Sequence, residues 1–384
     1  MREGWEVKKL DDFCDVEYGT RVVRKRDGGT IFPVYGGGGA TFFMDISNRE
    51  DCLVIARFAM SEKCTRFVKG KFFLNDSGLT VKPKNQNEII QEFLNLQFFY
   101  LNDYIYSLAR GTAQKNLDVP KFRKIDIVVP PLPEQIQIVN TLDKAFKQID
   151  QAKANLEKNL HNAKELFQSK LNEVFSQRGE GWEETTLGNI CTIKHGFAFK
   201  SQYFTMSGEY VLLTPGNFYE TGGYRDRGEK QKYYIGDIPQ DYILDKNDLL
   251  VAMTEQAAGL LGSPILVPED NKFLHNQRLG LVRPKINILW FNQFFYYLFN
   301  TNHVRTELHD SGTGVKVRHT SPTKIGNVNI SYPKSLDKQK ELVIELDKLH
   351  KLSNNLQTHY QQKLNNLEEL KKSILQKAFR GELV

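Results

Sequence analysis

Basic side chains interleaved with aromatic residues are the groups in this 384-residue sequence whose types and spacing best fit a chemical task. Arg and Lys neutralise phosphates, and Arg can pair with two atoms of a guanine edge, so such sets are typical of nucleic-acid-binding proteins. A single such residue is most often a solvated charge, and the prediction depends on two separate sets. The candidate DNA-contacting residues are Arg21, Arg24, Arg57, Arg66, Lys69, Lys115, Arg225, Arg227, Lys230, Arg278, Lys316 and Arg318.

The sequence contains none of the short motifs that mark common enzyme classes. It has no glycine-rich phosphate loop ending in Lys-Ser/Thr, no HExxH zinc helix and no GxSxG nucleophile elbow. Residues 130–133 lack the acid and the aromatic ring with which an amino-methyltransferase holds its target amine. Asp270-Asn271-Lys272 could end a nuclease pattern, but so short a match arises easily by chance, and a solvated loop is the simpler interpretation. We therefore expect no catalytic residue.

The four cysteines, Cys14, Cys52, Cys64 and Cys191, form no CxxC pair and stand at no ligand spacing with histidine. We interpret them as small core residues and expect no metal site. Four consecutive glycines at residues 36–39 lie between the basic residues of the first set and follow a predicted strand. A tight turn is the favoured interpretation, and close approach to a DNA backbone ranks ahead of a nucleotide cradle.

A long amphipathic helix that occurs twice must position these side chains. Residues 130–175 begin with prolines, which suit a first helical turn, and continue with apolar residues every three or four positions. A shift of 204 positions superimposes thirteen residues on identical ones in a second copy. In the first copy these are Gln135, Val139, Leu142, Asp143, Lys144, Lys147, Leu160, Asn162, Glu165, Leu166, Ser169, Leu171 and Phe175.

The apolar stripe predicts that the two helices pack together as an antiparallel coiled coil. At about 1.5 Å per residue each helix is roughly 60 Å long, and so long a rod cannot bury its stripe alone. The expected seam residues are Val139, Leu142, Phe146, Ile149, Leu156, Leu160, Val343, Leu346, Leu356, Leu364, Leu367 and Ile374. Ile136 continues the stripe toward the start of the first helix.

Each long helix follows a globular domain, so the expected fold class is α+β, with two mixed α/β domains and two antiparallel helices in a pseudo-twofold internal repeat. The expected parts are domain 1 at 1–130, the first helix at 131–178, domain 2 at 179–332 and the second helix at 333–384. We expect strands at 31–35, 53–57, 72–74, 79–81 and 125–129, and aromatic-rich helices at 89–108 and 289–308.

The two domains share a frame but differ inside it. Their starts match at an offset of 177, through Trp182, Cys191 and Gly196, whereas the helices match at 204, so domain 2 holds 27 more residues (204 − 177). Neither residues 36–39 nor residues 222–234 have a counterpart in the other domain. The sequence therefore predicts two different working surfaces, one at each end of the helix pair.

Composition sets broad limits on function. A net charge of +6 and a pI near 8.8 permit nucleic-acid binding without proving it. No apolar run approaches the roughly 20 residues that cross a bilayer, and the first ten residues do not resemble an export signal. We expect no membrane contact and a cytoplasmic location.

Five stretches make the chain resemble the specificity subunits of type I restriction-modification systems. Residues 130–135, Pro-Pro-Leu-Pro-Glu-Gln, are close to that family's entry into its first long helix, and Lys-Ala-Phe-Arg-Gly-Glu-Leu at 377–383 is typical of the end of its second. Residues 33–37 in domain 1, and 246–254 with 276–279 in domain 2, also match. The resemblance covers the whole chain, including the order domain, helix, domain, helix.

The resemblance implies that each domain is a target-recognition domain that reads one half of a split, asymmetric double-stranded DNA sequence. It implies that the helix pair sets the spacer and docks two methyltransferase (modification) subunits, which use S-adenosylmethionine for DNA methylation at adenine N6. Separate restriction motor-nuclease subunits use ATP and Mg. This chain would then be non-catalytic and bind no cofactor itself, while the DNA sequence and the base-contacting side chains stay undetermined.

One stretch departs from the family pattern. Residues 333–339, Pro-Lys-Ser-Leu-Asp-Lys-Gln, lack the Pro-Pro-x-x-Glu-Gln form, which predicts weaker capping at the start of the second helix. Two alternatives remain open from the residues themselves. A coiled-coil adaptor without DNA binding would explain the helices but not the two basic domains, and a stand-alone nuclease would need metal-dependent cleavage.

Overall fold

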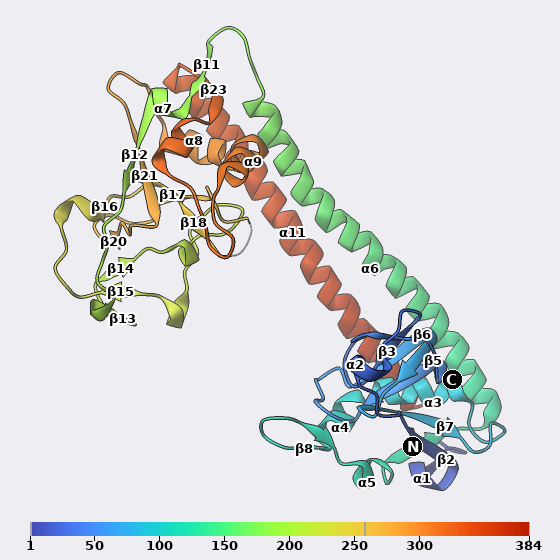
Figure 1. Ribbon diagram of the computed structural model, residues 1–384. Coiled ribbons are helices and arrows are strands. Elements are labelled where there is room, and N and C mark those ends of the chain that lie inside the picture. The colour runs from blue at the N-terminus through green and yellow to red at the C-terminus, as the bar shows by residue number, and fades with distance from the viewer. Residues whose placement is uncertain (1, 257–258, 384) are drawn as a thin grey trace. The chain divides into compact units, whose positions relative to one another are not determined.

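The computed structural model describes residues 2–256 and 259–383. The chain divides into two compact units, which are described one at a time. Unit 1 comprises Met1–Glu157 and Gln361–Val384, and unit 2 comprises Lys158–Tyr360. Each unit contains one globular domain together with part of each long helix, α6 (Leu132–Phe175) and α11 (Leu336–Phe379) (Figure 1). Among the described residues, no helix is both long enough and apolar enough to cross a membrane.

The domain of unit 1 is built on a six-stranded mixed sheet. Its strand order is β2 (Cys14–Tyr18), β7 (Gly78–Pro83), β5 (Arg49–Ala56), β6 (Thr65–Leu74), β3 (Phe32–Tyr35) and β4 (Phe43–Met44). All neighbours are antiparallel except β3 and β6, which are parallel. Two small antiparallel pairs are added, β1 (Glu6–Lys9) with β10 (Asp126–Val129) and β8 (Ala109–Arg110) with β9 (Asn116–Leu117). The helices are α1 (Leu10–Phe13), α2 (Arg24–Asp27), α3 (Gln91–Tyr100), α4 (Asn102–Ser107) and α5 (Val119–Phe122).

The domain of unit 2 repeats the frame and enlarges its interior. Strands β12 (Cys191–His195), β21 (Leu279–Pro284), β17 (Leu249–Ala252) and β19 (Pro264–Leu266) form an antiparallel sheet. A second sheet has the order β13 (Phe204–Thr205), β15 (Tyr233–Tyr234), β14 (Tyr210–Leu212), β20 (Phe273–Leu274), β16 (Ile243–Leu244). Further pairs are β11 (Trp182–Thr186) with β23 (Asn329–Pro333) and β18 (Thr254–Glu255) with β22 (Arg318–His319). The α-helices are α7 (Leu187–Ile190), α8 (Asn292–Phe299), α9 (Asn302–Ser311) and α10 (Pro322–Gly326), and the 3₁₀ turns are η1 (Ser201–Tyr203), η2 (Pro215–Asn217), η3 (Gly228–Lys230) and η4 (Gln240–Tyr242).

Each predicted aromatic-rich helix is in fact two helices. In unit 1 the break falls at Leu101, whose ψ of 4° departs from helical geometry. The next residue, Asn102, begins α4, and its side-chain oxygen accepts hydrogen bonds from the backbone N–H groups of Cys64 and Thr65. In unit 2, α9 restarts at Thr301, whose hydroxyl accepts a hydrogen bond from the Val304 N–H at 3.4 Å. The predictions at 89–108 and 289–308 were therefore correct in type and wrong in continuity.

The long helices run antiparallel in each unit. In unit 1 Asp150 and Lys153 of α6 contact Lys371 and Glu368 of α11, with N···O distances of 3.6 and 2.7 Å. In unit 2 the Ser353 hydroxyl donates to the Ala163 carbonyl at 2.8 Å. Position rises along one helix as it falls along the other, and all twelve expected seam residues are buried or half-buried.

The ends of the seam also belong to the domain cores. Val139 and Leu142 pack in the core of the unit 1 domain, and Val343 and Leu346 pack in that of unit 2. The stripe prediction is wrong at Ile136, which is 47 % exposed, while Ile138 is fully buried. Each domain is thus fused to its helices through a continuous core.

A buried glutamine fixes the start of each long helix in the same way. The Gln135 amide donates to the carbonyls of Pro130 (2.8 Å) and Glu88 (2.9 Å) and accepts from the Ile90 N–H (3.0 Å). Gln339 donates to the carbonyls of Pro333 and Leu289, both at 3.0 Å, and accepts from the Phe291 N–H at 2.9 Å. Each glutamine therefore ties its helix to the preceding strand and to the segment before the aromatic-rich helix.

The expected weakness at the start of α11 is not found. The Ser335 hydroxyl accepts a hydrogen bond from the Lys338 N–H at 3.3 Å, which is the arrangement of a helix N-cap. The departure from the Pro-Pro-x-x-Glu-Gln form thus replaces a proline-led first turn with a serine cap.

Residues 361–383 complete unit 1. The Arg2 guanidinium donates to the Gly381 carbonyl at 3.3 Å, and the Phe379 ring packs on Phe93 with centroids 5.3 Å apart. The core of unit 1 therefore draws on two stretches that are more than two hundred residues apart in the chain.

Candidate nucleic-acid interface

A glycine directly after edge strand β2 in unit 1, and one directly after edge strand β12 in unit 2, lies at very short range from the backbone of another segment. A Cβ atom on Gly19 would lie 1.9 Å from the Asn75 carbonyl oxygen, and one on Gly196 would lie 2.1 Å from the Asn276 carbonyl oxygen. No side chain fits at either position. Both domains therefore share a close approach of two backbone segments that requires glycine.

The glycine loop of unit 1 has an anchored half and an open half. A Cβ on Gly36 would meet the Asn75 side chain at 2.5 Å, and one on Gly37 would meet the Phe58 carbonyl oxygen at 2.6 Å. A Cβ atom on Gly38 or Gly39 would have nothing within 4 Å, and neither residue has a left-handed φ. Packing thus explains the first two glycines, whereas the last two leave bare backbone at the surface.

Cationic side chains of unit 1 are held around this loop. The Arg66 guanidinium donates to the Gly38 carbonyl. The Arg57 guanidinium lies over the rings of Tyr18 and Phe58, 4.8 and 4.5 Å from their centroids, and donates to the Asp76 carbonyl at 3.3 Å. These contacts pre-organise a cation beside exposed backbone, the combination that phosphate contacts use.

Lys115 lies in the loop between β8 and β9. Its Nζ is 4.5 Å from the centre of the Tyr106 ring, so its position is supported by an aromatic face. The structure brings Arg57, Arg66 and the glycine loop together. Arg21, Arg24 and Lys69 are exposed, and no described residue forms a hydrogen bond or ion pair with their side chains.

In unit 2 the basic residues lie on a loop closed by buried polar groups. The Asn217 amide donates to the Gln231 side-chain oxygen at 2.8 Å, and its own oxygen accepts from the Thr214 N–H at 3.0 Å. The intervening segment carries Arg225, whose guanidinium lies 5.8 Å from the centre of the Tyr219 ring, and Arg227, which packs on Gly216. Asn217 and Gln231 were missed by sequence reasoning, because their pairing has no counterpart in domain 1.

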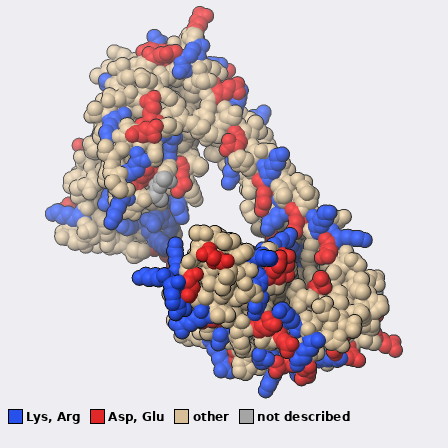
Figure 2. All heavy atoms as spheres, turned by 45° about the vertical axis from the view of Figure 1, so that its right-hand side comes forward, with Lys and Arg blue, Asp and Glu red and all other residues tan. Residues whose placement is uncertain are grey.

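The remaining candidates of unit 2 differ in their surroundings. Lys230, Arg278 and Lys316 are exposed. Arg318 is half-buried and donates to the His309 and Gly312 carbonyls, which holds the end of α9. Figure 2 shows Lys and Arg side chains gathering on part of the surface of each unit.

The groups that could suggest catalysis have structural partners. Asp270 accepts from the Lys246 N–H at 2.7 Å, Asn271 has a φ of 53° and Lys272 pairs with Glu269, so this stretch is a turn. Burial lowers the pKa of His275 to about 4, so its ring is neutral near pH 7. Within residues 2–256 and 259–383, no three His, Cys, Asp or Glu side chains are grouped as metal ligands.

The cysteines are mostly core residues. Cys14, Cys64 and Cys191 are buried, and burial raises the pKa of Cys14 and of Cys191 to about 12 and that of Cys64 to about 11. These thiols stay protonated near pH 7. Cys52 is half-buried in β5 and packs against the core cluster of Val54, Val68, Phe72 and Leu74.

Replacing both Gly38 and Gly39 by alanine is expected to leave stability within about 0.5 kcal/mol of the wild type, because nothing lies where the methyl groups would be. Affinity for duplex DNA at fixed salt should fall severalfold, because the methyl groups would hold a phosphate backbone away. Gly36→Ala is the matched control and should destabilise the fold, because its Cβ would overlap Asn75. Thermal unfolding and fluorescence anisotropy measure the two effects, and unchanged DNA affinity in the double variant would contradict the assignment.

The chain matches one family of proteins over most of its length. A family model described as "Type I restriction modification DNA specificity domain" matches residues 2–161 and 179–367. The chain is 24 % identical over 417 residues to the type I restriction enzyme MjaVIII specificity subunit of Methanocaldococcus jannaschii, covering 99 % of this chain and 93 % of that protein. It is 28 % identical to the StySPI specificity subunit of Salmonella potsdam, covering 74 % of this chain and 63 % of that protein.

Solved structures show the same fold. A chain from a structural study of the assembly and conformational transition of a type I R-M system superimposes with a TM-score of 0.76 and 20 % identity, covering 100 % of this chain and 99 % of that one. The HsdS subunit of Thermoanaerobacter tengcongensis gives a TM-score of 0.55 at 19 % identity, with 100 % and 98 % covered. None of these matches supports a coiled-coil adaptor or a stand-alone nuclease.

Proposed function

The chain belongs to the family of type I restriction-modification DNA specificity subunits, and from this premise we propose that each globular domain reads one half of a split, asymmetric DNA site. The observation that carries the proposal is that the two domains share a frame but differ in their loops. Gly19 and Gly196 make the same close backbone approach in both domains, whereas unit 1 carries an exposed glycine turn and unit 2 a closed polar loop.

Unlike loops on a common frame suit the reading of two different half-sites. Phosphate contacts set orientation without reading sequence, and base contacts in the groove carry the sequence information. We assign the first role to the exposed backbone at Gly38 with Arg66, and the second to the divergent cations, among them Arg57, Arg225 and Arg227. The helix pair would then fix the number of unread bases between the half-sites.

Repeated exposed residues on the long helices support two docked copies of one partner. Exposed positions are free to diverge after a duplication, yet seven of the thirteen identical pairs are exposed in both copies. In unit 1 they are Asp143, Lys144, Lys147, Asn366, Glu369, Leu370 and Ser373, and in unit 2 Asp347, Lys348, Lys351, Asn162, Glu165, Leu166 and Ser169. Each unit carries one full set, which we call the repeated face.

The repeated face fits a partner that binds twice. Leu166 and Leu370 are 63 % and 46 % exposed, and they occupy equivalent positions in the two units. We infer that two methyltransferase subunits dock there, use S-adenosylmethionine and modify adenine, while restriction motor-nuclease subunits supply ATP- and Mg-dependent cleavage. This chain would contribute recognition without catalysis, bind no cofactor and act on DNA in the cytoplasm.

The test is to express the chain with the methyltransferase of its system and to measure assembly and methylation together. We expect two methyltransferase copies per chain by native mass spectrometry and one bipartite methylated motif by methylome sequencing. Leu166→Glu and Leu370→Glu should each remove one copy, and the double variant should abolish methylation. Ile344→Glu is the matched control, because Ile344 is 71 % exposed but is matched by Asn140 in the repeat.

Two results would contradict this proposal. One is a methylated motif without a gap of unread bases. The other is full methyltransferase binding by the double leucine variant, while Ile344→Glu weakens it.

A further inference from the structure

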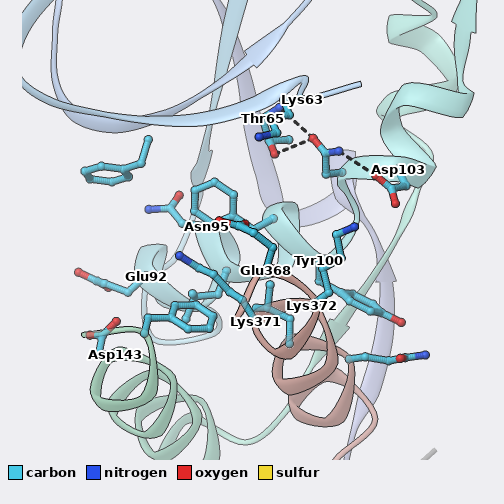
Figure 3. A pocket seen from close by; sticks show the side chains of 17 residues that line it. Lys63, Thr65, Glu92, Asn95, Tyr100, Asp103, Asp143, Glu368, Lys371 and Lys372 are labelled. Atoms are coloured by element: carbon cyan, nitrogen blue, oxygen red, sulfur yellow. Dashed lines mark hydrogen bonds between the residues drawn. The ribbon is translucent and has the colours of Figure 1, made fainter. Parts of the chain in front are cut away.

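A cavity of about 640 Å³ opens on the surface of unit 1 where the domain meets the helix pair. Figure 3 shows its wall, with Asp143 on α6, Glu368, Lys371 and Lys372 on α11, and Asn95 and Tyr100 on α3. Phe67, Phe99 and Phe146 contribute apolar surface, although Phe67 is itself 38 % exposed. The charged lining residues other than Lys371 are exposed, and we call them the rim. The cavity therefore combines aromatic surface with charged groups that face solvent.

The repeat identifies the equivalent place in unit 2. Gln135 accepts from the Ile90 N–H as Gln339 accepts from the Phe291 N–H, so residues of α3 and α8 correspond at an offset of 201. The ring pairs agree, since Phe93 packs on Phe379 at 5.3 Å as Phe294 packs on Phe175 at 4.9 Å. On this register Leu96, which lines the cavity, corresponds to Tyr297.

In unit 2 the equivalent place is filled by the chain itself. The Tyr297 hydroxyl donates to the Asp347 carboxylate at 2.6 Å. Its ring lies 6.3 Å from that of Phe167, which stacks on His350 with centroids 4.7 Å apart. One tyrosine thus satisfies a carboxylate and completes an aromatic cluster.

Unit 1 has the equivalent carboxylate but lacks the tyrosine. Asp143 is the counterpart of Asp347, but Leu96 cannot donate to it, and no described residue forms a hydrogen bond or ion pair with its carboxylate. In the repeat, Phe146 corresponds to His350, and Lys371 corresponds to Phe167. The Lys371 Nζ lies 4.7 Å from the centre of the Phe146 ring. The cavity therefore keeps the carboxylate without a described partner and one of the two rings, Phe146, in the place of His350, whose ring centroid lies 6.4 Å from that of Tyr297 in unit 2.

We propose that this cavity receives a tyrosine side chain of the methyltransferase subunit that docks on unit 1. The inference rests on the proposed function, because it takes the repeated face as the docking surface. Asp143 belongs both to that face and to the cavity wall, so a subunit on the face reaches the opening. Unit 2 holds its own tyrosine at the equivalent place, so the two docked subunits are not equivalent.

The first test uses Leu96→Tyr in the full chain, assembled with its methyltransferase subunits. The new tyrosine should reproduce the unit 2 arrangement, bond Asp143 and raise the melting temperature of unit 1. Affinity for one methyltransferase copy should fall at least about tenfold, the size of a lost hydrogen bond to a charged group. The other copy should bind as in the wild type.

The second test identifies the inserted side chain. A benzophenone amino acid at position 372, on the rim, should cross-link to a methyltransferase peptide that contains a tyrosine. Changing that tyrosine to phenylalanine and Asp143 to alanine should each weaken binding about tenfold, and the double variant should lose no more than either single variant. Glu92→Ala is the matched control, because Glu92 is an exposed rim carboxylate outside the repeated face.

The outcomes separate the two proposals. If the wild-type chain binds no methyltransferase subunit, the proposed function fails. If two copies bind and Leu96→Tyr changes neither affinity, or the cross-links reach no tyrosine, the cavity inference alone is overturned. Additive losses in the double variant would also overturn it.

Discussion

Exchange of residues 181–334 for the equivalent domain of another specificity subunit is expected to change one half of the methylated sequence and leave the other half unchanged. The junctions follow the structure, because β11 pairs with β23 over its full length and the Lys334 N–H donates to the Gly181 carbonyl at 3.0 Å. A cut at these two positions keeps that pair within the exchanged segment. Unit 1, with its own sheet and glycine loop, is untouched.

Methylome sequencing of cells that express the chimera with the methyltransferase gives the answer directly. A chimera rebuilt with its own domain across the same junctions is the control for the cuts themselves. A change in both half-sites would show that the domains do not read independently. An unchanged motif would place recognition outside the exchanged segment.

Gln135→Ala and Gln339→Ala are each expected to destabilise the unit that contains the residue by on the order of 3 kcal/mol. Each side chain makes three hydrogen bonds to backbone groups and is fully buried, so its removal leaves two carbonyls and one N–H without partners. The cost of such unpaired groups exceeds the net value of the bonds themselves.

Denaturant unfolding with a probe in each domain separates the two effects. Gln135→Ala should shift the transition of unit 1 and leave that of unit 2 near its wild-type midpoint, and Gln339→Ala should do the reverse. Gln137→Ala, an exposed glutamine on the same helix, should cost less than about 0.5 kcal/mol. A loss below about 1 kcal/mol for both buried glutamines would contradict their role.

The repeat and the helix pair could be predicted because they leave periodic and identical residues in the sequence. The break at Leu101 could not, because it accompanies hydrogen bonds from the Cys64 and Thr65 N–H groups to the Asn102 side chain, almost forty residues away. Ile136 and Ile138 are both apolar, and which one is buried depends on how the first turn packs against the domain. These differences arise from contacts between distant parts of the chain, which local patterns do not record.

The basic residues of the candidate interface could be predicted from the sequence, but the contacts that position their side chains could not. Arg57 and Arg66 were found by composition, but their support by Tyr18 and by the Gly38 carbonyl is visible only in the fold. Arg318 illustrates the converse, since it is equally basic yet holds the end of α9. Asn217 and Gln231 organise the loop of unit 2, but they belong to no sequence motif. A hydrogen bond between two side-chain amides requires only one pair of residues, and one pair leaves no recognisable pattern in the sequence.

Because unit 1 consists of two separate stretches of the chain, its core is completed later during synthesis than the core of unit 2. Unit 2 is continuous, so every residue of its core has been added to the growing chain by residue 360. Unit 1 must wait for Leu375, Ala378 and Phe379, which complete its core. Since domains generally fold as units during synthesis, unit 2 can mature first although its sequence begins later. During synthesis the chain therefore passes through a state in which the sequence of unit 2 is complete and that of unit 1 is not.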